Sequence, residues 1–99
     1  MKEHLRELVA QALLDLRRHG RLSPDIAIPD YVIERTKSRE HGDYASNIAL
    51  LLAKAVGMKP RDLADVLVST IGESNHVSKV AVAGPGFINF YLSEDFFAQ

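Results

Sequence analysis

A glycine–proline–glycine turn followed by an aromatic run is the feature that most constrains this chain. Gly84–Gly86 supply the turn, and Phe87–Leu92 read Phe-Ile-Asn-Phe-Tyr-Leu, which is rich in the aromatic and β-branched residues typical of a strand. Successive side chains of a strand point to opposite faces. The alternation places Ile88, Phe90 and Leu92 on one face, and Phe87, Asn89 and Tyr91 on the other.

The two faces of this strand predict different surroundings. The first face is wholly apolar, so we expect it to form part of the core. The second carries two rings on either side of an amide. If that face meets water, the rings could stack on bases and the amide could read a base edge, a combination that binds single-stranded or loop RNA. The alternative is a second buried layer with one hydrogen-bonded amide, because aromatic strands more often belong to a core.

The composition indicates one soluble globular domain over residues 1–99, with 46% hydrophobic and 25% charged residues. The net charge is −1, so any RNA contact has to be local. The absence of cysteine excludes disulfides and thiolate metal sites and fits a cytoplasmic location. The longest fully apolar run, Ala49–Ala53, is far shorter than the about 20 residues of a membrane helix. We expect neither a membrane segment nor a metal site.

Helical and strand patterns alternate along the rest of the chain. Apolar residues at helical spacing predict a helix over residues 2–19, which Gly20 ends. Pro60 suits the first position of a later helix. Tyr31–Lys37 and Val77–Ala83 are predicted strands. The second of these should pair with the aromatic strand as a hairpin, because the loop between them is short and contains glycine.

Asp43 is predicted to begin a helix over Tyr44–Val56. Its carboxylate could accept hydrogen bonds from the amides of the first turn, as an N-cap residue does, and Gly42 before it allows a sharp entry. The apolar residues that follow recur at helical spacing. His41 and Asp43 suggest an acid–base pair, but no nucleophile or third group accompanies them. We therefore expect a structural role for Asp43 and no catalytic residue here.

Arg35, Lys37 and Arg39 occupy alternate positions. On a strand or an extended edge they would point the same way, and three like charges on one face suit a phosphate backbone. The alternative is a solvated edge that uses charge to prevent pairing with another sheet. Both interpretations stay open at this point.

The last residues indicate a piece of a longer protein. Ser93 is a predicted N-cap, and Phe96 and Phe97 follow shortly before the chain stops at Gln99. A stable isolated helix needs about 12–15 residues, so a helix that has only begun cannot bury two phenylalanines by itself. We expect these rings to pack against something beyond the 99 residues.

Three segments of the chain resemble the N-terminal additional domain of arginyl-tRNA synthetases. They are His41–Asn47, the helix end that leads into Gly57–Arg61, and Val80–Phe90. The order and the spacing are those of the family. Gly-Pro-Gly-Phe-Ile-Asn after a valine-rich strand is quite specific, and the Gly-Asp-Tyr motif is moderately so. The resemblance covers essentially the whole chain.

The resemblance implies an α+β fold of two layers, with helices packed on one face of a roughly four-stranded antiparallel sheet. It also implies a place before a class I catalytic domain and a contact with the D-loop of tRNA(Arg). In the family, an aromatic residue and an amide two positions later contact the D-loop base that serves as an identity element. Those positions hold Phe87 and Asn89 here. Tyr91 lies outside this pattern and could extend the platform or pack nearby.

The class I nucleotide signatures, of the His-Ile-Gly-His and Lys-Met-Ser-Lys types, are absent from these 99 residues, and no glycine-rich phosphate loop replaces them. We expect this chain by itself to bind no ATP and to charge no tRNA. The full-length enzyme that it resembles ligates arginine to tRNA(Arg) with ATP, so the implied partners are that tRNA and the rest of the synthetase. A different hypothesis is a docking module, in which Phe96, Phe97 and the outward aromatic strand contact another protein or the rest of the chain.

Overall fold

Strand β4 (Phe87–Leu92) is an inner strand of a four-stranded antiparallel sheet, with β2 (Tyr44–Ser46) on one side and β3 (Val77–Ala83) on the other. Strand β1 (Ile33–Arg35) pairs with the free edge of β2, so the strand order is β1-β2-β4-β3. The predicted hairpin of β3 and β4 is confirmed. The computed structural model describes residues 1–94, so the predicted helix that would carry Phe96 and Phe97 lies outside the described residues.

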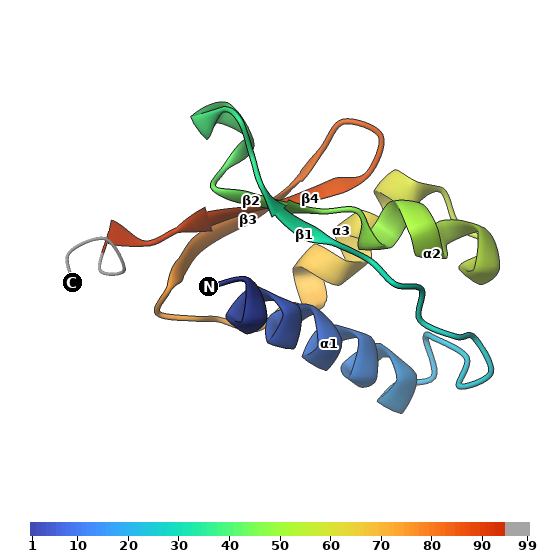
Figure 1. Cartoon of the computed structure of the whole chain (residues 1–99). Coiled ribbons are helices and arrows are strands. Elements are labelled where there is room, and N and C mark those ends of the chain that lie inside the picture. Colours follow the sequence, from blue (N-terminus) through green and yellow to red (C-terminus); the bar gives the residue numbers. More distant parts are fainter. Residues whose placement is uncertain (95–99) are drawn as a thin grey trace.

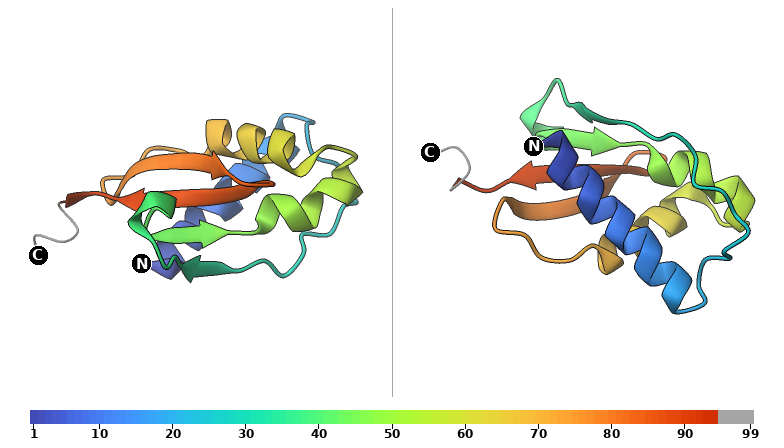
Figure 2. Two further views of the ribbon diagram at one scale, coloured as in Figure 1. Left: turned by 90° about the horizontal axis from the view of Figure 1, so that it is seen from above. Right: turned by 60° about the horizontal axis from the view of Figure 1, so that its bottom comes forward.

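Three helices accompany the sheet (Figure 1). Helix α1 (Lys2–Arg18) crosses beneath the strands, α3 (Pro60–Thr70) packs on the same side, and α2 (Ile48–Val56) continues from the end of β2. Seen from above, the opposite face of the sheet carries no helix of residues 1–94 (Figure 2, left). This arrangement confirms the predicted α+β fold class. None of the helices in the described part of the chain is long and apolar enough to cross a membrane.

The core lies between the sheet and the helices. Ile88 and Phe90 of β4 are each 0% exposed, and Leu92 is partly buried against the same cluster. The apolar face predicted for this strand is therefore confirmed. Helix α1 contributes its whole apolar stripe to the cluster, as its helical spacing requires; the buried residues of the stripe are Leu5, Val9, Ala12, Leu13 and Leu16.

The predicted helix over Tyr44–Val56 is wrong in its first turn. Tyr44–Ser46 form β2, and α2 begins only at Ile48. β2 pairs with β1 on one edge and with β4 on the other, so long-range partners satisfy its backbone groups. This pairing outweighs a local apolar pattern that fits a helix equally well.

The connection between β1 and β2 is also more irregular than predicted. β1 ends at Arg35, short of the predicted end at Lys37, and a single 3-10 turn follows, η1 (Arg39–His41). The hydroxyl of Ser38 accepts a hydrogen bond from the backbone N–H of Glu40 at 3.3 Å, which stabilises that turn. The connection rises above the helix-free face of the sheet (Figure 1).

Candidate nucleic-acid interface

The helix-free face of the sheet, called the open face below, carries the side chains that alternate away from the core along β4. Asn89 lies opposite Ala45 of β2 and Ala81 of β3, and Tyr91 lies opposite Lys79. Residues directly opposite in an antiparallel pair share a face. The centre of the open face is therefore an amide between two methyl groups, with aromatic rings before and after it along β4.

Phe87 begins β4 and its side chain is 39% exposed. The turn before it is held against the start of α3. Gly86 has a φ of +144°, and a Cβ atom there would lie 2.8 Å from the Cβ of Pro60. Arg61 Nη1 donates a hydrogen bond to the carbonyl oxygen of Gly84 at 2.6 Å. The backbone around the ring is thus fixed by the helix layer, while the ring itself meets solvent.

Asn89 lies on the predicted face, but it is only 3% exposed. The neighbouring side chains at the centre of the sheet leave little of this residue accessible to solvent. Its side-chain amide makes no hydrogen bond with any of residues 1–94. The amide atoms are also not among the fully buried groups without a partner, so a small solvent-facing area remains on them. An enclosed amide without a partner is uncommon in proteins and calls for a reason.

Tyr91 is half-buried and is held on both sides. Its hydroxyl donates a hydrogen bond to the carbonyl oxygen of Glu40 in η1 at 2.7 Å, and Lys79 Nζ lies 4.9 Å from the centroid of its ring. The ring is therefore a fixed wall of the open face that already carries a cation. We did not predict a role for Lys79 from the sequence. The hairpin register would have indicated it, because pairing Ala83 with Phe87 also places Lys79 opposite Tyr91.

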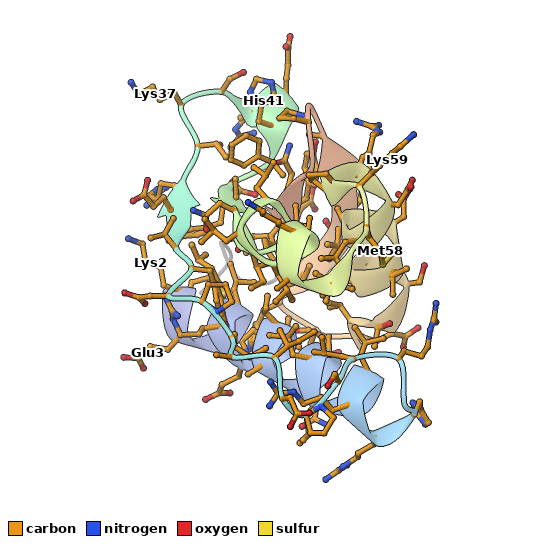
Figure 3. The ribbon with its side chains drawn as sticks, turned by 90° about the vertical axis from the view of Figure 1, so that its right-hand side faces the viewer. Lys2, Glu3, Lys37, His41, Met58 and Lys59 are labelled. Carbon is orange, nitrogen blue, oxygen red and sulfur yellow. The ribbon has the colours of Figure 1, made fainter. Side chains whose placement is uncertain are left out.

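The structure brings Arg35, Lys37 and Arg39 together, although they do not share a strand. Arg35 ends β1, Lys37 follows it, and Arg39 begins η1. All three line one surface hollow of about 190 Å³, which we call the cationic hollow. Arg35 also lies over the ring of Tyr44, with Cζ 5.7 Å from its centroid. Lys37 lies at the tip of the connection (Figure 3).

Asp43 does not cap a helix, so that prediction is wrong. Its carboxylate accepts a hydrogen bond from the backbone N–H of Leu92 at 2.8 Å. Gly42, just before it, has a φ of +78°, and a Cβ atom there would lie 2.6 Å from the carbonyl oxygen of Phe90. The glycine and the aspartate therefore let the connection lie directly on the end of β4.

No metal-ligating cluster is found among the described residues. Residues 1–94 contain no group of three His, Asp or Glu side chains that could hold a metal ion, and no hydrogen bond within this range joins His41 to Asp43. Burial raises the pKa of Tyr31, and the neighbouring Arg6 guanidinium partly offsets the rise. Tyr31 belongs to the core cluster, so this titration does not bear on the open face. The open face can offer stacking, hydrogen bonding and positive charge.

Solved structures of arginyl-tRNA synthetases share this fold. The enzyme of Plasmodium falciparum superposes with a TM-score of 0.76 at 18% identity, over 96% of this chain and 16% of that one. The enzyme of Thermus thermophilus superposes with a TM-score of 0.73 at 24% identity, over 97% of this chain and 14% of that one. At these identities the likeness concerns the fold alone.

Sequence comparison is more specific. An arginine–tRNA ligase of Stutzerimonas stutzeri (strain A1501) is 48% identical over 99 residues, which are all of this chain and 17% of the relative. One of Pseudomonas aeruginosa (strain LESB58) is 52% identical over 91 residues, which are 92% of this chain and 15% of the relative. This chain thus spans about a sixth of the length of these relatives. The family model described as the arginyl tRNA synthetase N-terminal domain matches residues 3–92, and the chain belongs to that family.

Proposed function

We propose that this domain binds the D-loop of tRNA(Arg) as the N-terminal part of an arginine–tRNA ligase. In this proposal the ring of Phe87 stacks on an unpaired D-loop base, and the amide of Asn89 hydrogen-bonds the edge of that base. The rest of the ligase binds ATP and arginine and carries out the ligation. Residues 1–94 contribute affinity and selectivity for the tRNA and take no part in the chemistry.

The observation that carries this proposal is the unpaired amide of Asn89 beside an exposed ring on the same face of one strand. Phe87 and Asn89 are two positions apart on β4, so their side chains point the same way and lie about 7 Å apart along the strand. The amide has no hydrogen-bond partner within the described residues, and a base edge offers both a donor and an acceptor. A base stacked on Phe87 brings such an edge to the centre of the open face.

The expected contact energies indicate how tightly such a domain would bind tRNA by itself and within the ligase. Stacking a base on an aromatic side chain contributes about 1–3 kcal/mol, and a good bidentate contact to a base edge adds about 1–3 kcal/mol of discrimination. A micromolar complex needs about 8 kcal/mol, so the domain alone would bind the tRNA weakly. Within the ligase, the contact becomes intramolecular once the tRNA is bound elsewhere, and a weak contact then multiplies an existing affinity.

The proposal is tested in the full-length ligase with Phe87→Leu and Asn89→Ala. Phe87→Leu keeps an apolar side chain and removes the stacking surface, whereas Phe87→Tyr keeps the ring. We expect Phe87→Leu and Asn89→Ala each to lower kcat/KM for tRNA about tenfold, which corresponds to about 1.4 kcal/mol. Phe87→Tyr should stay close to wild type. Arginine activation measured without tRNA turnover should be unchanged in all three.

The control residue is Leu14. Its exposed fraction of 42% is close to the 39% of Phe87, but it belongs to α1 on the other side of the sheet. Leu14→Ala should leave the tRNA kinetics at the wild-type level. If the folded double variant Phe87→Leu/Asn89→Ala charges tRNA as well as wild type, the proposed contact does not exist. An equal loss of tRNA charging in Leu14→Ala would show a general effect on the fold and not a tRNA contact made by the open face.

A further inference from the structure

We infer that Lys37 and Arg39, in the cationic hollow, bind a backbone phosphate of the same RNA strand whose base stacks on Phe87. The inference rests on the proposed function and adds a second contact point to it. It also gives the path of the RNA strand, which would run from the stacked base along β4 toward the C-terminal end of that strand.

The hollow has the charge and the shape of an anion site. Three cationic residues from neighbouring parts of one connection line a volume of about 190 Å³. Arg35 pairs with Tyr44, which pairs with the core residue Phe90, so its side chain lies on the helix-covered face, over the Tyr44 ring. Within residues 1–94, the side chains of Lys37 and Arg39 make no salt bridge and donate no hydrogen bond, so these two charges are not compensated by protein groups. The Arg guanidinium presents several donors in a fixed fork that matches phosphate oxygens.

The carboxylate of Asp43 also lines the hollow, but it is already occupied as the acceptor for the backbone N–H of Leu92. The hydroxyl of Thr36 has one hydrogen to donate and lies within hydrogen-bonding reach of the carbonyl oxygens of Ser38 and Gly42, so it too is used within the connection. The groups left over for a ligand are therefore the cations of Lys37 and Arg39. Two uncompensated positive charges against one engaged carboxylate favour an anion.

The hollow is continuous with the open face. Arg39 lines the cationic hollow and also a neighbouring hollow of about 530 Å³, whose wall includes Tyr91. From Phe87 to Tyr91 the strand advances four residues, or about 13 Å. Lys79 lies over the Tyr91 ring at the end of this span. Figure 2 (left) shows the open face with the connection at one end of it.

The favoured ligand is a phosphate of RNA, and the other candidate is an acidic segment of the ligase itself. Both would use the same cations, but only the first releases counterions from a nucleic acid. For a single strand, each neutralised phosphate contributes about 0.7 to the slope of log K against log salt. The slope therefore separates the two candidates.

The experiment measures binding of unmodified tRNA(Arg) transcript to the full-length ligase by fluorescence anisotropy over a range of KCl concentrations. The test variant is Lys37→Gln/Arg39→Gln, since both side chains are exposed and glutamine removes the charge while keeping a polar side chain. Arg35 is left in place because it packs over Tyr44. The control is Arg18→Gln/Arg21→Gln, which changes the net charge equally at exposed positions near the end of α1 that lies far from the connection (Figure 1). Phe87→Leu is measured in parallel.

We expect Lys37→Gln/Arg39→Gln to weaken binding at low salt and to reduce the slope by about 0.7, the value for one phosphate. The control should keep the wild-type slope, and Phe87→Leu should weaken binding without changing the slope. An unchanged slope in the test variant overturns the inference, and if Phe87→Leu still weakens binding, the proposed function stands without it. An equal fall of the slope in test and control also overturns the inference, because it shows a general effect of charge. A reduced slope in the test variant with no effect of Phe87→Leu supports the phosphate site and rejects the stacking contact.

Discussion

The carboxylate of Asp43 accepts a hydrogen bond from the backbone N–H of Leu92 at 2.8 Å. The backbone N–H of Asp43 also donates to the carbonyl oxygen of Phe90 at 2.8 Å. One residue of the β1–β2 connection therefore bonds twice to the end of β4. The strand that carries Phe87 and Asn89 is thus fixed at its start by α3 and at its end by Asp43.

Replacing Asp43 should loosen the end of β4 and leave α2 intact. A hydrogen bond to a charged acceptor contributes about 1.5–3 kcal/mol, and the partial exposure of Asp43 places the expected loss for Asp43→Ala near about 1–2 kcal/mol. Asp43→Asn should lose less, because it keeps an oxygen acceptor. Amide hydrogen exchange is the most direct readout. Leu92 should lose protection while the amides of Leu51 and Leu52 keep theirs, and the reverse pattern would mean that Asp43 caps the helix after all.

Gly42 and Gly57 differ both in backbone conformation, with ψ of −163° and 30°, and in the space around them. Both have a φ of +78°, but a Cβ atom would lie 2.6 Å from the Phe90 carbonyl oxygen at Gly42 and would meet nothing within 4 Å at Gly57. Gly57→Ala should cost about 1–2 kcal/mol for the left-handed backbone alone. Gly42→Ala should cost at least about 3 kcal/mol, because a backbone clash adds to strain that is about 1–3 kcal/mol by itself. Urea unfolding measures both, and equal losses would show that the connection does not lie closely on β4.

Asn89 and Asn47 have the same side chain but opposite hydrogen-bonding states. Asn47 Oδ1 accepts a hydrogen bond from the backbone N–H of Val32 at 2.9 Å, whereas the Asn89 amide has no partner within residues 1–94. Asn47→Ala should lower the free energy of unfolding by about 1 kcal/mol. Asn89→Ala should leave it unchanged or raise it, since removing an unsatisfied polar group relieves a desolvation penalty. A large loss of stability in Asn89→Ala would indicate that the amide serves the fold rather than a ligand.

The burial of Tyr31 predicts that the free energy of unfolding falls at alkaline pH. Burial raises the pKa of its hydroxyl above the usual value of 10.0, so the folded protein holds this proton more tightly than the unfolded chain does. The resulting stability is fully present below pH 10 and is lost as the pH rises through the folded-state pKa. The free energy of unfolding of wild type should therefore fall more between pH 9 and pH 11 than that of Tyr31→Phe. Urea titrations of both proteins at these pH values give the difference, and parallel curves would contradict it.

The sequence predicts the elements whose periodicity and boundaries are local. The stripe of α1, Pro60 at the start of α3 and the β3–β4 hairpin are each determined by residues close together in the chain, and all are found in the structure. The strand β2 was missed because only three residues form it and its stability comes from pairing with β1 and β4. A motif whose partner lies 49 residues away in sequence, as Leu92 does from Asp43, cannot be distinguished locally from a helix cap.

The sequence predicts only part of the candidate site, again because some of its features depend on residues that are distant in the chain. Alternation along β4 correctly separates the core residue Phe90 from the exposed ring of Phe87. Alternation does not predict how deeply Asn89 is enclosed, because that depends on strands on both sides of it. The spacing of Arg35 and Lys37 indicated a cluster of cations. In the structure these residues and Arg39 line one hollow because of the turn at η1 and not because they share a strand face.

The central claim is that Phe87 and Asn89 together contact one D-loop base, and a thermodynamic cycle tests it most directly. The full-length ligase and its Phe87→Leu/Asn89→Ala variant are each assayed with tRNA(Arg) transcripts in which the unpaired D-loop bases are removed one at a time. For one position, removal of the base should lower kcat/KM about tenfold in wild type, or about 1.4 kcal/mol, and should have almost no effect in the variant. If removal of every D-loop base lowers kcat/KM by the same factor in both enzymes, the two side chains do not contact the D-loop.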